Sequence, residues 1–185
     1  RWAGARPGVQ NCTWRMFEQS LDHFSPGATP NHGSTFMQRY CIYFGFREDM
    51  SSSSSSSSPP IFFYTGNESP VEEYVNNTGL MWELGYKMKA VLIFAEHRYE
   101  GESVPSLQGL DNCLSYCTST QALADYGTLI QWIKTTEGLQ GSPVVAFGGS
   151  YGGMLAGWLR LKYPSTVVGA IAASAPIWGF PLEGP

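Results

Sequence analysis

Short apolar runs recur along the chain from residue 61 onwards. Four of them contain almost no charged residue: 61–65 (IFFYT), 90–95 (AVLIFA), 143–147 (PVVAF) and 167–173 (VVGAIAA). A strand that is buried on both faces has such a continuous run, whereas a half-exposed strand alternates between apolar and polar residues. We therefore predict four buried strands.

The segments between these runs carry apolar residues at helical spacing. The clearest is 119–135, whose apolar stripe is preceded by a capping-box pair, Thr118 and Gln121. We also expect helices over 70–88 and over 151–163, the second of which is stopped by Pro164. In the first, the residues expected to face inward are Val71, Tyr74, Val75, Leu80, Met81 and Leu84. Alternating strands and helices predict an α/β fold with three layers and a mostly parallel sheet.

The region before residue 61 has weaker patterning. Residues 1–35 predict irregular, turn-rich structure, and 39–46 (RYCIYFGF) predict a strand. Residues 50–60 hold eight consecutive serines and two prolines, which predict a low-complexity surface loop. The length of 185 residues suits one domain. Because the chain begins at Arg1 and stops just after an apolar run, we expect 1–185 to be the N-terminal part of a larger domain.

Composition and charge exclude several classes of protein. The net charge is −4 and there is no basic run, so we expect no nucleic-acid partner. No apolar stretch approaches 18 residues, so we expect no membrane span. The four cysteines form no Cys-x-x-Cys motif and allow three pairings. We expect no metal or other cofactor.

Glycosylation signals point to a compartment. Sequons begin at Asn11, Asn67 and Asn76, and the number of cysteines is even. Both features favour a disulfide-containing glycoprotein of the secretory pathway, either lysosomal, vacuole-like or extracellular.

The segment with chemical meaning is 147–153 (FGGSYGG), which matches Gly-x-Ser-x-Gly. It lies between a predicted strand and a predicted helix, as a nucleophile elbow requires. Such a sharp reversal holds Ser150 in a strained conformation and leaves no room for side chains at Gly148 and Gly152. We therefore predict that Ser150 is a nucleophile. A phosphate loop is the alternative, but no Lys follows Gly153.

An oxyanion site should accompany the elbow. The Tyr151 N–H lies at the start of the predicted helix and can donate to a developing oxyanion. A second donor is expected from the loop after 61–65, where Gly66 permits close approach and Asn67 offers its own N–H. The alternative is that Gly66 only makes a turn. We expect no glycan on Asn67, since it would obstruct the site.

The base and acid of a catalytic triad are missing from the expected region. In α/β-hydrolases they follow the serine, yet after Ser150 the chain contains no His and no Asp. His97 follows a strand at the same sheet edge; it is either a base or, as we favour, a structural histidine. We expect Arg98 to form a local charge network with Glu96 or Glu102. The chain as it stands should lack a working triad.

Six colinear segments resemble one family, the serine peptidases that include lysosomal Pro-X carboxypeptidase, dipeptidyl peptidase II and thymus-specific serine protease. The segments are 19–24 (QSLDHF), 62–68 (FFYTGNE), 96–103 (EHRYEGES), 121–126 (QALADY), 148–155 (GGSYGGML) and 173–177 (ASAPI).

The resemblance implies an α/β-hydrolase core, truncated before a helical cap and the last strands. It implies cleavage of proline-containing peptides, by release of either a C-terminal residue or an N-terminal dipeptide, with Ser150 as nucleophile. The family's Asp and His have no counterpart here. The sequence departs from the family in its serine tract, at Ser69 and at Glu100, and a Cys113–Cys117 disulfide is a further expectation.

Two other functions remain open at this point. An esterase or lipase can use the same elbow, and a catalytically dead hydrolase-like binding protein would not need the missing acid and base. The sequence also leaves open whether the protein forms a homodimer.

Overall fold

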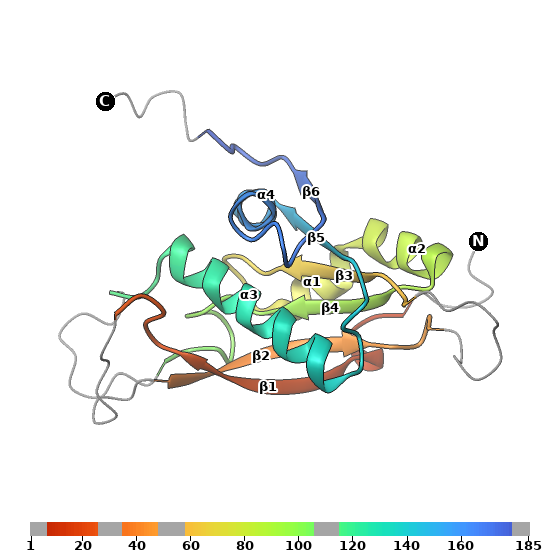
Figure 1. The fold of residues 1–185 in the computed structure, drawn as a ribbon, viewed down its shortest axis with the longest axis horizontal. Coiled ribbons are helices and arrows are strands. Elements are labelled where there is room, and N and C mark those ends of the chain that lie inside the picture. The colour runs from red at the N-terminus through yellow and green to blue at the C-terminus, as the bar shows by residue number, and fades with distance from the viewer. Residues whose placement is uncertain (1–6, 26–34, 48–57, 106–114, 179–185) are drawn as a thin grey trace.

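A computed structural model describes residues 7–25, 35–47, 58–105 and 115–178 (Figure 1). Its centre is a six-stranded sheet in the order β1-β2-β4-β3-β5-β6. The strands are β1 (Thr13–Ser20), β2 (Thr35–Tyr43), β3 (Ile61–Thr65), β4 (Val91–Ala95), β5 (Val144–Gly149) and β6 (Gly169–Ala173). The neighbours among β4, β3, β5 and β6 pair in parallel, whereas β2 pairs antiparallel with both β1 and β4.

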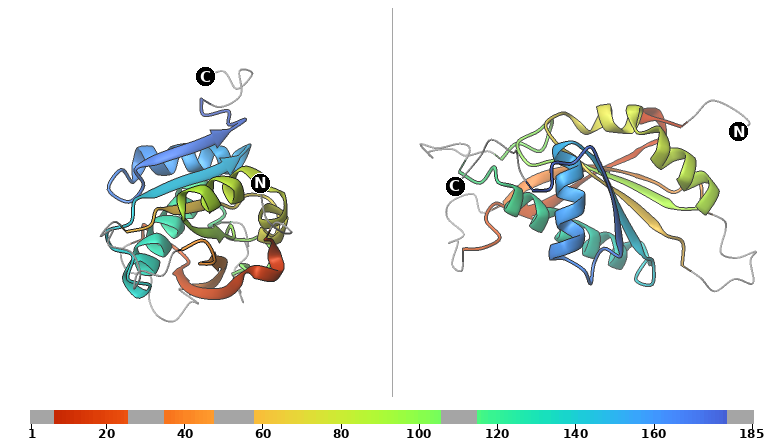
Figure 2. Two further views of the ribbon diagram at one scale, coloured as in Figure 1. Left: turned by 90° about the vertical axis from the view of Figure 1, so that its right-hand side faces the viewer. Right: turned by 90° about the horizontal axis from the view of Figure 1, so that it is seen from above.

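Helices cover both faces of the sheet, so the molecule has three layers (Figure 2). Helices α1 (Val71–Asn77) and α2 (Gly79–Met88) lie on one face. Helices α3 (Ser119–Thr136) and α4 (Tyr151–Lys162) lie on the other, and a short 3-10 turn, η1 (Val9–Asn11), precedes β1. The predicted α/β class with a mostly parallel sheet is confirmed.

Each space between the sheet and the helices holds its own apolar core. Under α3 and α4 the fully buried side chains include Tyr126, Leu129 and Leu155. Under α1 and α2 the largest is Trp82, whose indole N–H donates to the Val75 carbonyl at 2.8 Å. Sheet strands buried from both sides explain the continuous apolar runs in β3 and β4.

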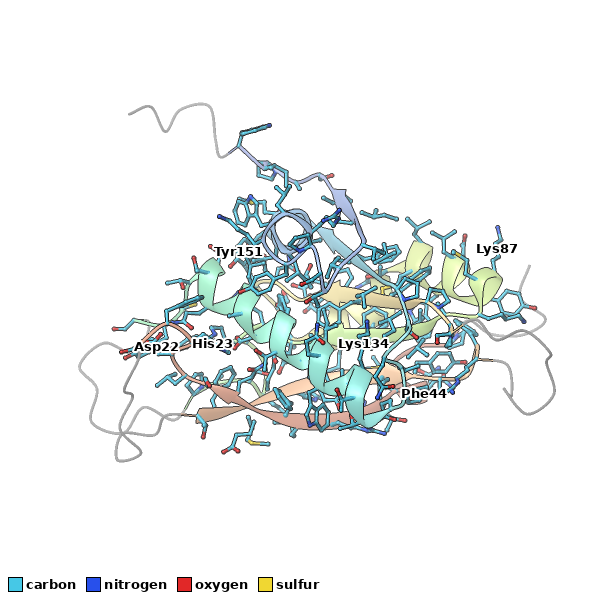
Figure 3. All side chains as sticks on the ribbon, viewed as in Figure 1. Asp22, His23, Phe44, Lys87, Lys134 and Tyr151 are labelled. Carbon is cyan, nitrogen blue, oxygen red and sulfur yellow. A yellow bond between two sulfur atoms is a disulfide. The ribbon has the colours of Figure 1, made fainter. Side chains whose placement is uncertain are left out.

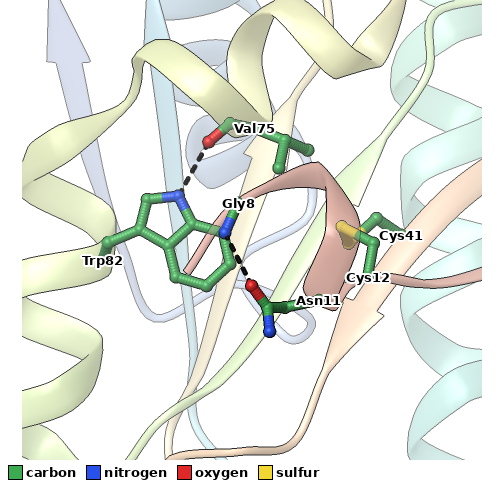
Figure 4. Close-up of a disulfide and its surroundings, with 6 residues drawn as sticks. All are labelled: Gly8, Asn11, Cys12, Cys41, Val75 and Trp82. Atoms are coloured by element: carbon green, nitrogen blue, oxygen red, sulfur yellow. Dashed lines mark hydrogen bonds between the residues drawn. A yellow bond between two sulfur atoms is a disulfide. The ribbon is translucent and has the colours of Figure 1, made fainter. Parts of the chain in front are cut away.

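A disulfide between Cys12 and Cys41 joins the segment before β1 to β2, close to Trp82 (Figure 4). This bond occurs in one of the three pairings of the four cysteines that the sequence left open. Cys117 is a free, exposed thiol, and Cys113 lies outside the described residues. The structure therefore gives no support to the expected Cys113–Cys117 disulfide.

The prediction of irregular structure over 1–35 was wrong, because β1 is an eight-residue strand within it. β1 pairs along its whole length with β2, from Thr13 opposite Ile42 to Ser20 opposite Thr35. It is an edge strand with mostly exposed or half-exposed residues, so it carries no apolar run. Its partner β2 also begins earlier than the predicted strand and ends earlier.

Two details of the helices and strands also differ from expectation. The predicted helix over 70–88 is broken at Thr78, whose ψ of 71° is not helical. Leu80, which was expected to face inward, is 51% exposed, and Trp82 is fully buried instead. β6 was expected to be buried, but it is an edge strand here and its residues 171–173 are exposed.

Of the predicted serine loop over 50–60, residues 50–57 lie outside the described part of the chain. Within that part, none of the helices is both long enough and apolar enough to cross a bilayer.

Candidate active site

Ser150 is the single residue that connects β5 to α4, and its backbone has φ 54° and ψ −124°. A non-glycine residue at positive φ is strained by about 1–3 kcal/mol and persists only where its surroundings enforce it. Its backbone is held on both sides: the Ser150 N–H donates to the Ala173 carbonyl, and the Ser150 carbonyl accepts from Met154, each at 2.9 Å. The side chain is exposed at the carboxyl edge of the sheet.

The glycines around Ser150 leave no space for side chains. A Cβ on Gly148 would lie 2.1 Å from the Gly152 carbonyl oxygen, and one on Gly152 would lie 2.7 Å from the Thr65 carbonyl oxygen. Gly149 differs, because a Cβ there would meet nothing within 4 Å. The chain can therefore reverse from strand to helix only if positions 148 and 152 have no side chain.

Thr65 ties the elbow to the neighbouring strand β3. Its hydroxyl lies 2.7 Å from the Gly152 carbonyl oxygen and 3.1 Å from the Phe147 carbonyl oxygen, and the hydrogen bonds are buried. Sequence reasoning missed this role. A signal was present, since Thr65 is the one aliphatic hydroxyl residue in the run 61–65 and stands at its carboxyl end, just before Gly66.

Two backbone N–H groups near Ser150, those of Tyr151 and Asn67, have no acceptor in the part of the chain that the structure describes. Tyr151 is the first residue of α4, where an N–H has no acceptor within the helix. In the loop after β3, no acceptor for the Asn67 N–H is found among the described residues. Both groups belong to elements that meet at the elbow, because the Asn67 side chain lies against Gly152 and its Nδ2 lies 3.5 Å from the Gly149 oxygen.

The backbone N–H of Gly66, unlike that of Asn67, has a hydrogen-bond acceptor. Its N–H donates to the Ala95 carbonyl at 3.1 Å, and its carbonyl accepts from the Tyr126 hydroxyl at 2.7 Å. A Cβ on Gly66 would lie 2.3 Å from the Ala95 oxygen. Gly66 thus allows the loop to pass close to β4, and its N–H is already engaged.

His97 is buried at the end of β4 and contacts the elbow through Tyr151. Its Nδ1 lies 2.6 Å from the Arg98 carbonyl oxygen and its Nε2 lies 3.1 Å from the Tyr151 hydroxyl. Burial lowers the pKa of His97, which favours the neutral ring. Burial also raises the pKa of the Tyr151 hydroxyl to about 12, so it stays protonated. No hydrogen bond between His97 and Ser150 exists in the described structure.

Arg98 forms its ion pair with Asp125 on α3, not with Glu96 or Glu102 as expected. Nε lies 2.7 Å from Asp125 Oδ2 and Nη2 lies 2.7 Å from Oδ1, and both side chains are fully buried. The guanidinium also donates to three carbonyls, those of Ser20, Leu21 and Tyr116. Asp125 Oδ1 receives a further hydrogen bond from His23 Nε2 at 2.7 Å.

These contacts place the segment after β1 on α3, which is where Asp22 and His23 lie in Figure 3. Gln121 contributes to the same junction, because its side chain bonds Asp22 and His23. The predicted capping box is therefore only half formed: Thr118 Oγ1 accepts from the Gln121 N–H at 3.2 Å, while the Gln121 side chain points to the junction.

Glu96 organises the loop on the other side of His97. Its carboxylate is buried and accepts from the Val71 N–H at the start of α1, the Glu102 N–H and the Ser103 hydroxyl. Gly101, at φ 49°, leaves the space that the carboxylate fills. Glu102 pairs with Arg39 on β2. The acidic residues near Arg98 in sequence thus serve other contacts.

A pocket of about 360 Å³ lies beside the strand end that carries the elbow. Its lining is mostly apolar and comes from β3, the junction of α1 and α2, β5 and β6. The lining residues are Tyr64, Asn77, Thr78, Gly79, Leu80, Phe147, Gly148, Gly149, Ile171 and Ala173. Among the described residues, no group of three His, Cys, Asp or Glu is placed to hold a metal ion.

This geometry can be compared with known proteins. The family model described as serine carboxypeptidase S28 matches residues 19–180. The chain belongs to the S28 serine carboxypeptidase family. The matched range contains the elbow, the loop with Asn67 and the Arg98–Asp125 pair.

Individual relatives agree with the family match. Lysosomal Pro-X carboxypeptidase from Mus musculus is 50% identical over 166 residues, which is 88% of this chain and 32% of that protein. The Homo sapiens protein of the same name is 48% identical over 176 residues, 93% of this chain and 33% of that protein. The chain thus spans about a third of the length of these curated relatives.

The fold also matches a solved structure. A crystal structure titled "a putative dipeptidyl aminopeptidase IV" from Bacteroides ovatus superposes with a TM-score of 0.54 at 14% identity, over 91% of this chain and 22% of that one. At this identity the likeness concerns the fold alone, and it agrees with the α/β-hydrolase architecture predicted for the core.

A pair of glycine substitutions tests the packing of the elbow. Gly148→Ala should lower the stability of the protein by about 1–3 kcal/mol or more, because the new methyl overlaps the Gly152 carbonyl. Gly149→Ala is the matched control and should cost far less, since its methyl enters open space. Urea or thermal unfolding measures both. Equal losses in the two variants would contradict the packing described.

The Arg98–Asp125 pair gives a second prediction. Replacing Arg98 with Met leaves the Asp125 carboxylate buried without its guanidinium, which should destabilise the protein by about 3–5 kcal/mol. Lys134→Met, on the same helix α3, is a control that leaves this pair in place. Thermal unfolding measures both variants, and an Arg98→Met protein as stable as Lys134→Met would show that the pair does not hold the loops.

Proposed function

We propose that Ser150 is the nucleophile of a serine exopeptidase that cleaves peptides at prolyl bonds through an acyl-enzyme. The observation that carries the proposal is the conformation of Ser150, which is exposed at φ 54° directly before the N-terminus of α4. Membership of the S28 family supports the reaction class. The name Pro-X carboxypeptidase, borne by relatives about half identical to the chain, supports proline specificity and release of the residue that follows proline.

In this mechanism the Ser150 oxygen attacks the carbonyl carbon of the bond after proline. A tetrahedral intermediate forms, and its oxyanion accepts hydrogen bonds from the Tyr151 and Asn67 N–H groups. Asn67 is the better second donor than Gly66, because the Gly66 N–H is bonded to Ala95. One such donor contributes about 10²–10³ in kcat. The proton removed from Ser150 is passed to the nitrogen of the scissile bond, collapse of the intermediate expels the departing residue as an amine, and water then hydrolyses the acyl-enzyme.

Ser150 needs a base to remove its proton. No His or Asp follows Ser150 in the sequence, and the Nε2 of His97 accepts from Tyr151. We propose that the acid and base come from outside these 185 residues, in line with the third of the relatives' length that the chain spans. These residues alone should then be inactive as a peptidase.

We also propose a secretory or lysosomal protein. The curated relatives carry the word lysosomal in their names. The disulfide and the exposed sequon residues Asn11 and Asn76 suit that route. Asn67, by contrast, is only 8% exposed and lies against the elbow, so we expect it to carry no glycan.

The test uses the full-length protein that contains this chain. Ser150→Ala should abolish release of the last residue from a peptide ending in Pro-X, because no other group takes over the attack. Ser165→Ala, an exposed serine after α4, is the matched control and should keep full activity. Release of the C-terminal residue is followed by mass spectrometry, and labelling by a fluorophosphonate probe should depend on Ser150.

Other outcomes separate the alternatives. Undiminished peptide cleavage by Ser150→Ala would remove Ser150 from the mechanism. Hydrolysis of short acyl esters without peptide cleavage would indicate an esterase. An intact protein that neither cleaves nor reacts with the probe would indicate a catalytically dead hydrolase-like protein.

A further inference from the structure

We propose that His97 is a positioning residue for this reaction: through its hydrogen bond to the Tyr151 hydroxyl, it fixes the first residue of α4 and so aims the Tyr151 N–H at the oxyanion. The inference rests on the proposed role of Ser150 and adds to it a residue from a different strand, 53 positions earlier in the sequence than the nucleophile.

The direction of each hydrogen bond follows from its partners. A carbonyl oxygen can only accept, so the 2.6 Å contact between His97 Nδ1 and the Arg98 oxygen requires the proton on Nδ1. In the neutral ring, Nε2 then carries a lone pair and accepts from the Tyr151 hydroxyl at 3.1 Å. The ring nitrogens are both used, so His97 has a defined tautomer and orientation.

His97 is held rigidly by the residues on either side of it. The Glu96 carboxylate is anchored to α1 and to the following loop, and the Arg98 guanidinium is anchored to Asp125 on α3. The side chains of both residues are fully buried, and His97 itself is 4% exposed. A hydrogen bond that such a fixed ring accepts constrains its donor more than one accepted by a mobile surface side chain.

The hydrogen bond between His97 and Tyr151 joins segments that follow two strands not adjacent in the sheet. β3 lies between β4, which carries His97, and β5, which leads to Ser150. The backbone of His97 lies close to Gly66 at the end of β3, where a Cβ on Gly66 would lie 3.1 Å from the backbone nitrogen of His97. The absence of a side chain at Gly66 therefore lets the segment that carries His97 pack directly against the loop after β3.

Tyr151 is the residue that needs such a constraint. Its N–H has no acceptor within α4, and it follows the strained Ser150. Its ring packs edge-on against His97, with 5.5 Å between ring centroids, and packs against the core under α3 and α4. Freeing this side chain would let the first turn of the helix move, and with it the direction of the oxyanion donor.

The test compares variants of the full-length protein with a Pro-X peptide. Tyr151→Phe keeps the ring and removes the hydroxyl, and it should lower kcat about tenfold with KM within about twofold. His97→Leu should give a similar loss. The double variant should be no worse than either single one, since both remove the same bond. His97→Gln places an amide oxygen near the Nε2 position and should restore part of kcat only when Tyr151 is present.

A second measurement reports on the oxyanion site itself. A peptide boronic acid forms a tetrahedral adduct with a serine nucleophile, and its affinity should fall about tenfold in Tyr151→Phe while KM stays near the original value. Tyr163→Phe, at the other end of α4, is the matched control and should change neither quantity.

Three results would overturn the inference. These are unchanged kcat and boronate affinity in Tyr151→Phe, additive losses in the double variant, and a higher KM with unchanged kcat, which would make Tyr151 a substrate contact instead. A failure of the proposed function gives a different result, because in that case the Ser150→Ala variant would still cleave the peptide.

Discussion

The site depends on one constraint, the positive φ of Ser150 between a strand and a helix. No local preference of serine produces it. It exists because β6 accepts the Ser150 N–H, α4 uses its carbonyl, and Gly148 and Gly152 allow the backbone segments to touch. Thr65 closes the arrangement from β3. Contacts from three strands and one helix thus offset the backbone strain at Ser150 and keep its hydroxyl exposed.

A second layer of buried polar contacts positions the loops around that hydroxyl. Glu96 and Arg98, two residues apart directly after β4, bind different helices, α1 and α3, while His97 between them contacts α4. Groups of this kind cost free energy when buried unless every partner is present. Their completeness here explains why the segment is rich in charged residues although it lies in the interior, and it fixes the geometry of the edge where chemistry would occur.

Patterns that act over a few residues were readable from the sequence. The apolar runs of β3, β4 and β5 and the stripe of α3 gave the layers, and the spacing of Gly148, Ser150 and Gly152 gave the elbow. Several of the misses involve partners that are distant in the sequence. β1 shows no apolar run because its stability comes from pairing with β2 at the sheet edge.

Hydrogen bonds and ion pairs between residues far apart in the chain could not be predicted from the sequence either. Arg98 has two acidic neighbours in sequence, yet it binds Asp125, 27 positions away. Gly66 and Asn67 were equivalent candidates until the fold showed that the Gly66 N–H serves Ala95. Sequence spacing identifies which residue types meet at a turn, but the direction of an N–H or a guanidinium is decided by tertiary packing.

The most direct test of this account is a crystal structure of the full-length protein with a peptidyl phosphonate bound covalently. The account predicts a bond from phosphorus to Ser150 Oγ, with the phosphonyl oxygen about 2.7–3.1 Å from the backbone nitrogens of both Tyr151 and Asn67. An adduct on another residue, or a phosphonyl oxygen turned away from both nitrogens, would contradict it.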